Sequence, residues 1–220
     1  MVLVAKASDI AKKIAPPPHG TVEGAIFGKI FEQLYILKNH VKPGDLDTFI
    51  LGIFVSDLRY QLEFHNIYSE ELLRKGVMMY EALHRAGVTG VGVKPTFRKY
   101  EGGVYIAAQP DLYNPYLDIY FEFKTYPIDE YAKKQAEIFA WVLDHPVVLI
   151  GFRKVGDGYE VEEIVVEPKP LNIDPMIVRS VAREQPVDPS RYIPPHRMLR
   201  RNKPDEEDEK RVERAVALEV

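Results

Sequence analysis

The chain has 220 residues, of which 46% are hydrophobic and 28% are charged, so it has the composition of a globular protein with one full-sized domain plus appendages. The formal net charge of −4 excludes a global basic field and leaves only a local patch for a nucleic-acid partner. The absence of cysteine excludes disulfides, thiolate metal sites and cysteine-held iron–sulfur clusters. Because there is no membrane-spanning apolar run and no signal-peptide pattern, we expect a cytoplasmic protein without a membrane partner. The Lys/Glu/Arg-rich composition is compatible with a thermophile.

Residues 1–68 are expected to form an N-terminal helical region. Apolar residues at helical spacing predict a helix at 21–40, and helices are also expected at 1–15 and 46–64. The breaks between them contain the proline- and glycine-bearing stretches PPPHG and VKPGD. A further helix is predicted at 69–87, with Ser69 as its N-cap and Gly87 as its stop.

The pattern changes after Gly90 to strands, which predicts a core domain over residues 69–166. The expected strands are 90–100, 103–113 and 116–126, followed by a helix at 127–145 and a hairpin of strands at 146–155 and 159–168. This order favours an α/β (α+β) fold with a central mixed β-sheet flanked by helices. Residues 167–220 are rich in proline and charge and are expected to form an extended C-terminal arm and tail.

The stretch QPDLYNPYLDIYFEFKTY places charged residues inside a strand-forming segment. Side chains alternate along a strand, so Glu122 and Lys124 share one face while Phe121 and Phe123 point into a core. A hairpin through Asn114 and Pro115 would bring Asp111 beside Glu122. Two carboxylates held this close repel each other unless a cation neutralises them.

A hard divalent ion suits two oxygen ligands and several waters, which predicts Mg²⁺ or Mn²⁺ at Asp111 and Glu122. Lys124 could then orient a metal-bound water, help to deprotonate it, or stabilise charge that builds up on a phosphate. The competing interpretation is structural. Glu122 and Lys124 would form an ion pair on a solvated sheet face, with Asp111 as a turn residue.

Pro110-Asp111 followed by Glu122-Phe123-Lys124 resembles the signature of the PD-(D/E)XK nuclease superfamily. Gln135 and Phe139, on the next helix, are similar to the Q-x-x-x-Y element of its RecB-like branch, with Phe in place of Tyr. The chain most resembles the CRISPR-associated RecB-type exonucleases. Many of these hold an iron–sulfur cluster by four cysteines, and this chain has none, which implies a cluster-free viral or archaeal relative.

The resemblance implies a restriction-endonuclease-like core and a divalent-metal-dependent DNA nuclease, exonuclease-like in action. Asp111, Glu122 and the backbone carbonyl of Phe123 would ligate the metal. Lys124 would position the attacking water, and Gln135 would orient Lys124 or contact the DNA backbone.

The family also carries an upstream helix that reads roughly G-x-x-x-H-E-x-L. The sequence GVMMYEAL, from Gly76, has Tyr80 where the family has His, and offers Glu81 as an extra metal-binding carboxylate. A rival copy, GKIFEQL, offers Glu32. Glu81 is preferred because its helix directly precedes the strands.

Three further features carry both functional and structural interpretations. Asp118 could face the site or sit at the solvated rim of its strand, and His84 could approach the site from the helix of Glu81. The basic segment 191–203 could grip DNA, form a homo-oligomer contact through the arm, or be a solvated tail. A catalytically silent nuclease-fold protein that binds nucleic acid or a protein partner is the alternative function.

Overall fold

The computed structural model describes residues 1–15, 22–38, 46–86, 88 and 90–201, without the side chains of 32–38, 46–50 and 199–201. The helices are α1 (Ala7–Ile14), α2 (Val22–Lys38), α3 (Leu46–Phe64), α4 (Glu70–Arg85), α5 (Glu130–Leu143), α6 (Pro175–Val181) and α7 (Pro195–Arg201). Two 3₁₀ turns, η1 (Glu101–Gly103) and η2 (Pro189–Arg191), complete the helical elements. The strands are β1 (Val2–Lys6), β2 (Val91–Gly92), β3 (Thr96–Lys99), β4 (Tyr105–Ala108), β5 (Leu112–Asn114), β6 (Ile119–Phe123), β7 (Val147–Val155), β8 (Gly158–Val166) and β9 (Arg183–Gln185).

The strands form two mixed sheets flanked by helices, where the sequence predicted one central mixed sheet. The four-stranded sheet has the order β3-β4-β1-β9, and the five-stranded sheet has the order β2-β5-β6-β7-β8. The parallel pairs are β1 with β4 and β6 with β7, and the other pairs are antiparallel. The α+β class with mixed sheets is therefore confirmed.

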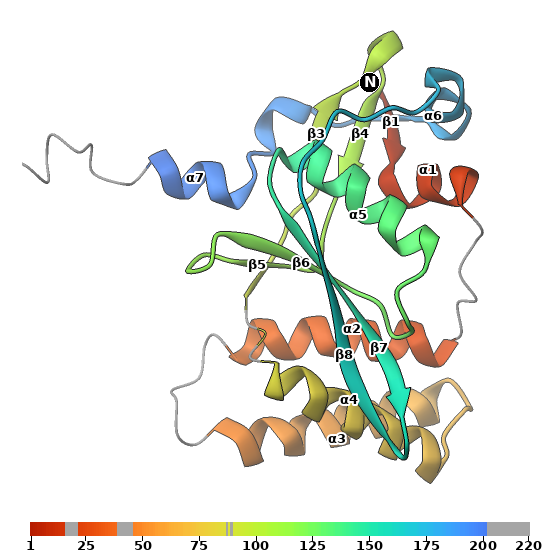
Figure 1. The fold of residues 1–220 in the computed structure, drawn as a ribbon, viewed down its shortest axis with the longest axis vertical. Helices are drawn as coiled ribbons and strands as arrows, with labels where there is room; N and C mark the ends of the chain where they lie inside the picture. Colours follow the sequence, from red (N-terminus) through yellow and green to blue (C-terminus); the bar gives the residue numbers. More distant parts are fainter. Residues whose placement is uncertain (16–21, 39–45, 87, 89, 202–220) are drawn as a thin grey trace, which may run out of the picture.

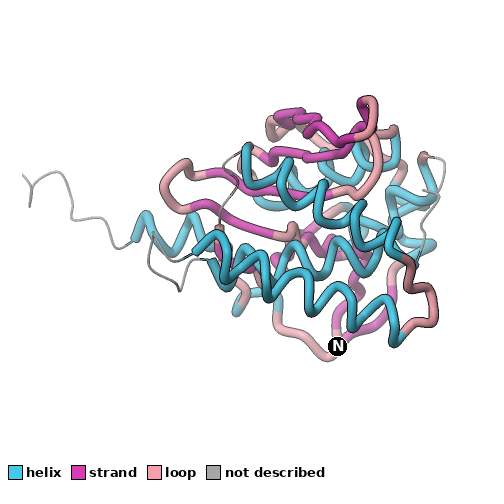
Figure 2. Tube along the Cα trace, turned by 90° about the horizontal axis from the view of Figure 1, so that it is seen from below, coloured by secondary structure: helices cyan, strands magenta, loops and turns pink. Residues whose placement is uncertain are grey.

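The five-stranded sheet separates two hydrophobic cores. Helices α2, α3 and α4 pack on one face, against Phe121 and Phe123 of β6. Helices α1 and α5 pack on the other face together with the four-stranded sheet, against Tyr120 of β6. Figure 1 shows α2–α4 gathered at the lower end, with α1, α5 and β1, β3 and β4 above them. Seen from below in Figure 2, long helices lie across the strands.

Helix starts and turns lie where the local chemistry predicts them. The Ser69 side chain caps α4 by accepting from the Leu72 N–H at 3.1 Å, and Asp129 caps α5 by accepting from the Ala132 N–H at 2.8 Å. The predicted helices at 21–40, 46–64 and 127–145 are also confirmed as α2, α3 and α5. The stop predicted at Gly87 lies outside the described residues.

Three predicted segments differ from the structure. Residues 1–15 are not one helix, because Val2–Lys6 form β1, which lies between β4 and β9. The strand predicted at 90–100 divides into β2 and β3, which belong to different sheets. The strand predicted at 103–113 divides likewise into β4 and β5, because Gln109 and Pro110 interrupt it just before Asp111.

The described part of the C-terminal arm, up to Arg201, is held against the molecule rather than fully extended. Strand β9 pairs with β1, Val178 of α6 is fully buried, and His196 of α7 is buried. Through β1 and β9, residues from the predicted N-terminal region and arm therefore build one sheet with β3 and β4 of the predicted core. None of the helices in the described residues has the length and apolarity to cross a membrane.

Candidate functional site

The β5–β6 hairpin is shaped by its own polar side chains. The Asn114 side-chain oxygen accepts from the N–H groups of Tyr116 and Leu117, at 2.9 and 3.0 Å. This is the Asx type of turn, in which a side chain replaces a backbone acceptor. Asp118 then adopts the left-handed conformation, with φ of 54°, which Asp tolerates better than most residues. The turn predicted at Asn114-Pro115 is thereby confirmed, and it fixes the register of the two strands.

That register brings Asp111 beside Glu122. Leu112 pairs with Phe121, so one further step along the antiparallel ladder sets Asp111 opposite Glu122 on the same face. The Asp111 carboxylate also accepts from the Phe123 N–H at 2.7 Å, where the β5 backbone no longer supplies an acceptor. The carbonyl of an extended residue points to the same side as its N–H, so the Phe123 carbonyl is directed toward Asp111 as well.

Lys124 lies between Glu122 and Gln135. Its ammonium donates to Glu122 Oε1 at 2.7 Å and to Gln135 Oε1 at 2.9 Å. The side chains of Lys124 and Glu122 are only 11% and 6% exposed, so this is a buried ion pair and not a solvated surface pair. Gln135 projects from α5, across the face of the sheet that carries Glu122. The structure thus joins Glu122, Lys124 and Gln135 as one hydrogen-bonded chain.

The protonation of Lys124 follows from its surroundings. Burial alone would lower the pKa of its ammonium, but the charge of Glu122, the hydrogen bond to it and the charge of Asp111 outweigh burial and raise the pKa. Lys124 is therefore a cation at neutral pH. In this arrangement it can donate hydrogen bonds and offset negative charge, but it cannot accept a proton.

One carboxylate oxygen in this group is buried without a partner. Among the described residues, Glu122 Oε2 is the one buried side-chain N or O atom with no hydrogen bond. A buried charged oxygen left unpaired is costly, and such an atom in a folded protein calls for a ligand, an ion or a water. The orphaned oxygen lies on the same face as Asp111.

No protein-family model matches this chain, and no curated protein matches it either. The candidate site is therefore defined by the geometry of the chain itself.

The upstream carboxylate at Glu81 does not join the site. Helix α4 packs on the Phe121 and Phe123 face of the sheet, whereas Glu122 faces α5. Consistent with this, no three His, Asp or Glu side chains in the described residues come together as metal ligands. Sequence order does not reveal which face of the sheet a helix covers, so the metal-binding role expected for Glu81 gains no support from the fold and stays a prediction. The rival Glu32 lies in α2, and its side chain is outside the described residues.

Two further candidates also lie away from the site. Asp118 accepts from the Tyr113 hydroxyl at 2.6 Å and lies 3.1 Å from His145, so it belongs to the hairpin turn. His84 stacks on Tyr80, on the α4 side of the sheet. Within the basic segment 191–203, His196 is bonded to the body of the protein. Its ring shares a hydrogen bond of 2.8 Å with the Tyr120 hydroxyl and stacks on His145. That anchors α7 to β6, and residues 202–203 lie outside the described chain.

The Gln135–Phe139 pair is confirmed on the inward face of α5, where both side chains are buried. Sequence reasoning missed Tyr131, which lies one turn before Gln135, with its ring 5.9 Å from the Lys124 ammonium. Burial raises the pKa of Tyr131, Lys124 lowers it, and the charges of Glu122 and Asp9 raise it further. The signal was available, because positions four apart share a helix face.

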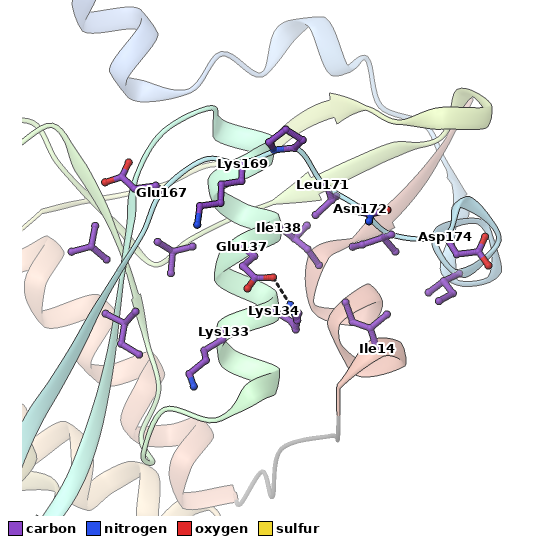
Figure 3. A pocket seen from close by; sticks show the side chains of 16 residues that line it. Ile14, Lys133, Lys134, Glu137, Ile138, Glu167, Lys169, Leu171, Asn172 and Asp174 are labelled. Carbon is purple, nitrogen blue, oxygen red and sulfur yellow. Dashed lines mark hydrogen bonds and ion pairs between the residues drawn. The ribbon is translucent and has the colours of Figure 1, made fainter.

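A large cavity elsewhere takes no part in this group. It has a volume of about 680 Å³ and lies between α5, the end of β8 and the segment 167–174. Its walls are mainly aliphatic, and Lys134 at its rim is already paired with Glu137 at 2.7 Å (Figure 3). None of Asp111, Glu122, Lys124 and Gln135 lines it.

Proposed function

We propose that the protein is a divalent-metal-dependent nuclease that hydrolyses phosphodiester bonds in DNA. The observation that carries this proposal is the buried, unpartnered Glu122 Oε2 beside Asp111. A solvated ion pair or a turn carboxylate, the structural interpretation of the same residues, gives no reason for that oxygen to be buried and unpaired.

The residues present suit Mg²⁺ or Mn²⁺. Mg²⁺ is commonly held by one or two carboxylates, with water and substrate phosphate completing the coordination, so the absence of a third carboxylate in the described residues is no obstacle. Asp111 and Glu122 would hold the ion, with the Phe123 carbonyl on the same side of the strand. When bound, it would supply charge neutralisation at the phosphate and a water of lowered pKa.

Lys124 and Gln135 have separate roles in this proposal. The protonated Lys124 offers hydrogen bonds to the attacking water or to a phosphate oxygen, which favours the more negative transition state. Gln135 fixes the ammonium by accepting from it, so it is a positioning residue.

The test is degradation of linear single- and double-stranded DNA in Mn²⁺ or Mg²⁺. Wild type should degrade DNA only with metal, and Asp111→Asn, Glu122→Gln and Lys124→Ala should each lose activity by at least about 100-fold, as expected for loss of one charge-stabilising group. Glu81→Gln is the matched control, because it makes the same chemical change on the opposite side of the sheet, and it should retain wild-type activity.

Two outcomes would refute the proposal. Activity that survives both Asp111→Asn and Glu122→Gln would show that the site is elsewhere. Metal-independent degradation would exclude the chemistry altogether.

A second candidate is a silent nuclease-fold protein that binds DNA or a protein partner without cleaving DNA. The observation that favours it is that charged side chains of the site already have partners within the chain. Lys124 already pairs with Glu122, and Asp111 already accepts a backbone N–H. Metal-independent DNA binding by wild type, without cleavage in either metal, is the result that would select it.

A further inference from the structure

A second, smaller cavity adjoins the candidate site. It has a volume of about 260 Å³ and is lined by Gln135, the partner of Lys124, and by Gln109, which lies two residues before Asp111. The cavity therefore touches the site from two elements, α5 and the segment that leads into β5. Its volume is below the range of about 300–1,000 Å³ that suits drug-sized ligands, so it fits one small group.

The lining is rich in amides. Three of the five glutamines in the chain, Gln109, Gln135 and Gln185, surround this one cavity. An ammonium can only donate, so the Gln135 oxygen must face Lys124, and its NH₂ group is left as the donor that it can offer to the cavity. Gln109 is exposed and Gln185 half-buried, and each brings one acceptor and two donors.

The remaining walls suit a planar ring with an attached anion. Phe97 and Phe139 supply aromatic surface, and Lys6 supplies a positive charge. No acidic side chain lines the cavity, although Asp and Glu outnumber Lys and Arg in the chain by 33 to 29. Amide pairs read the edges of nucleobases, aromatic side chains stack on their faces, and lysine contacts phosphate.

We propose that this cavity binds a single unstacked nucleobase of the DNA strand whose phosphodiester lies at Asp111 and Glu122. This inference rests on the proposed function and narrows its substrate to single-stranded DNA or to a strand end that can unstack. A base within a duplex is stacked on both faces and cannot enter this cavity unless it is flipped out.

The test is fluorescence anisotropy with a labelled single-stranded oligonucleotide and an abasic oligonucleotide of equal length, both in Ca²⁺. The protein variants are Gln109→Ala/Gln185→Ala and, as a single change that adds negative charge, Gln109→Glu. Gln61→Ala, on α3 at the other face of the sheet, is the matched control. Wild type should bind the base-bearing strand about 5- to 100-fold more tightly than the abasic strand, the range that stacking of one base supplies.

Both cavity variants should lose that preference, while Gln61→Ala should keep it. Equal affinity of wild type for the two strands, or no binding of either, would overturn the inference. So would a preference that survives in both variants with unchanged circular dichroism. A separate cleavage assay distinguishes the two proposals. Base-dependent binding without cleavage in Mn²⁺ refutes the nuclease and keeps the cavity, whereas equal cleavage and binding of abasic DNA refutes the cavity and keeps the nuclease.

Discussion

Replacement of Lys124 by Met should destabilise the protein strongly, because it removes the only cation that contacts Glu122 in the described residues. At 2.7 Å and an effective dielectric constant of about 20, the gross Coulomb attraction is about 6 kcal/mol. Desolvation of both groups offsets part of this attraction. The expected loss is the ~3–5 kcal/mol typical of a buried pair that is broken from one side.

Urea unfolding at pH 7 measures this loss directly. For a chain of this size each kcal/mol corresponds to about 2–4 °C in melting temperature, so the variant should melt about 6–20 °C below wild type. A companion variant, Lys124→Met with Glu122→Leu, should recover most of the stability, since apolar pairs replace buried ion pairs with little loss.

Two results would refute this reasoning. A loss below about 1 kcal/mol for Lys124→Met would mean that the pair behaves as an exposed one. A double variant no more stable than Lys124→Met would mean that the unpaired carboxylate is not the cause.

Three other predictions follow from particular contacts. Burial raises the pKa of Tyr126 to about 12, and the pKa of Lys124 is also raised, so the folded state holds both protons more tightly than the unfolded state does. Stability should therefore fall as pH rises from about 10 to 12. In thermal melts the melting temperature of Tyr126→Phe should fall less steeply with pH over this range than that of wild type. Gly151→Ala should cost about 1–3 kcal/mol in urea unfolding, because its Cβ would lie 2.7 Å from Ile128 Cγ1, whereas Gly52→Ala, with nothing within 4 Å, should be neutral or stabilising. His196→Ala should release α7, and faster tryptic cleavage at Arg197 with an unchanged core would be the readout; unchanged cleavage would contradict it.

Local pattern was sufficient to predict the carboxylate pair. Alternation along β6 and the turn at Asn114 together determine that Asp111 meets Glu122, and both signals lie within one short stretch of sequence. The helix period in turn predicted that Gln135 and Phe139 share a face. What alternation could not reveal is that the face with Glu122 is also buried, because α5 and the four-stranded sheet that cover it come from elsewhere in the chain.

The features that the sequence did not reveal all depend on contacts between segments that are far apart in the chain. Strand β1 was predicted as helix because its neighbours in the sheet are β4 and β9, which no pattern around Val2–Lys6 can announce. The metal-binding role expected for Glu81 gains no support from the fold, because a helix can pack on either face of a sheet and its connections decide which face it covers. Gln185 carried no sequence signal at all, since β9 is only three residues long and its place in the cavity depends on its pairing with β1.

The pairing of β1 with β9 has a consequence for the order in which the molecule can be completed. During synthesis Lys6 emerges early, but the sheet that holds it acquires β4 later and β9 later still. The five-stranded sheet, with Asp111, Glu122 and Lys124, draws on residues 91–166 and can pair before then. The amide-lined cavity needs both Lys6 and Gln185, so a nascent chain possesses the charged residues of the site well before it possesses the cavity beside them.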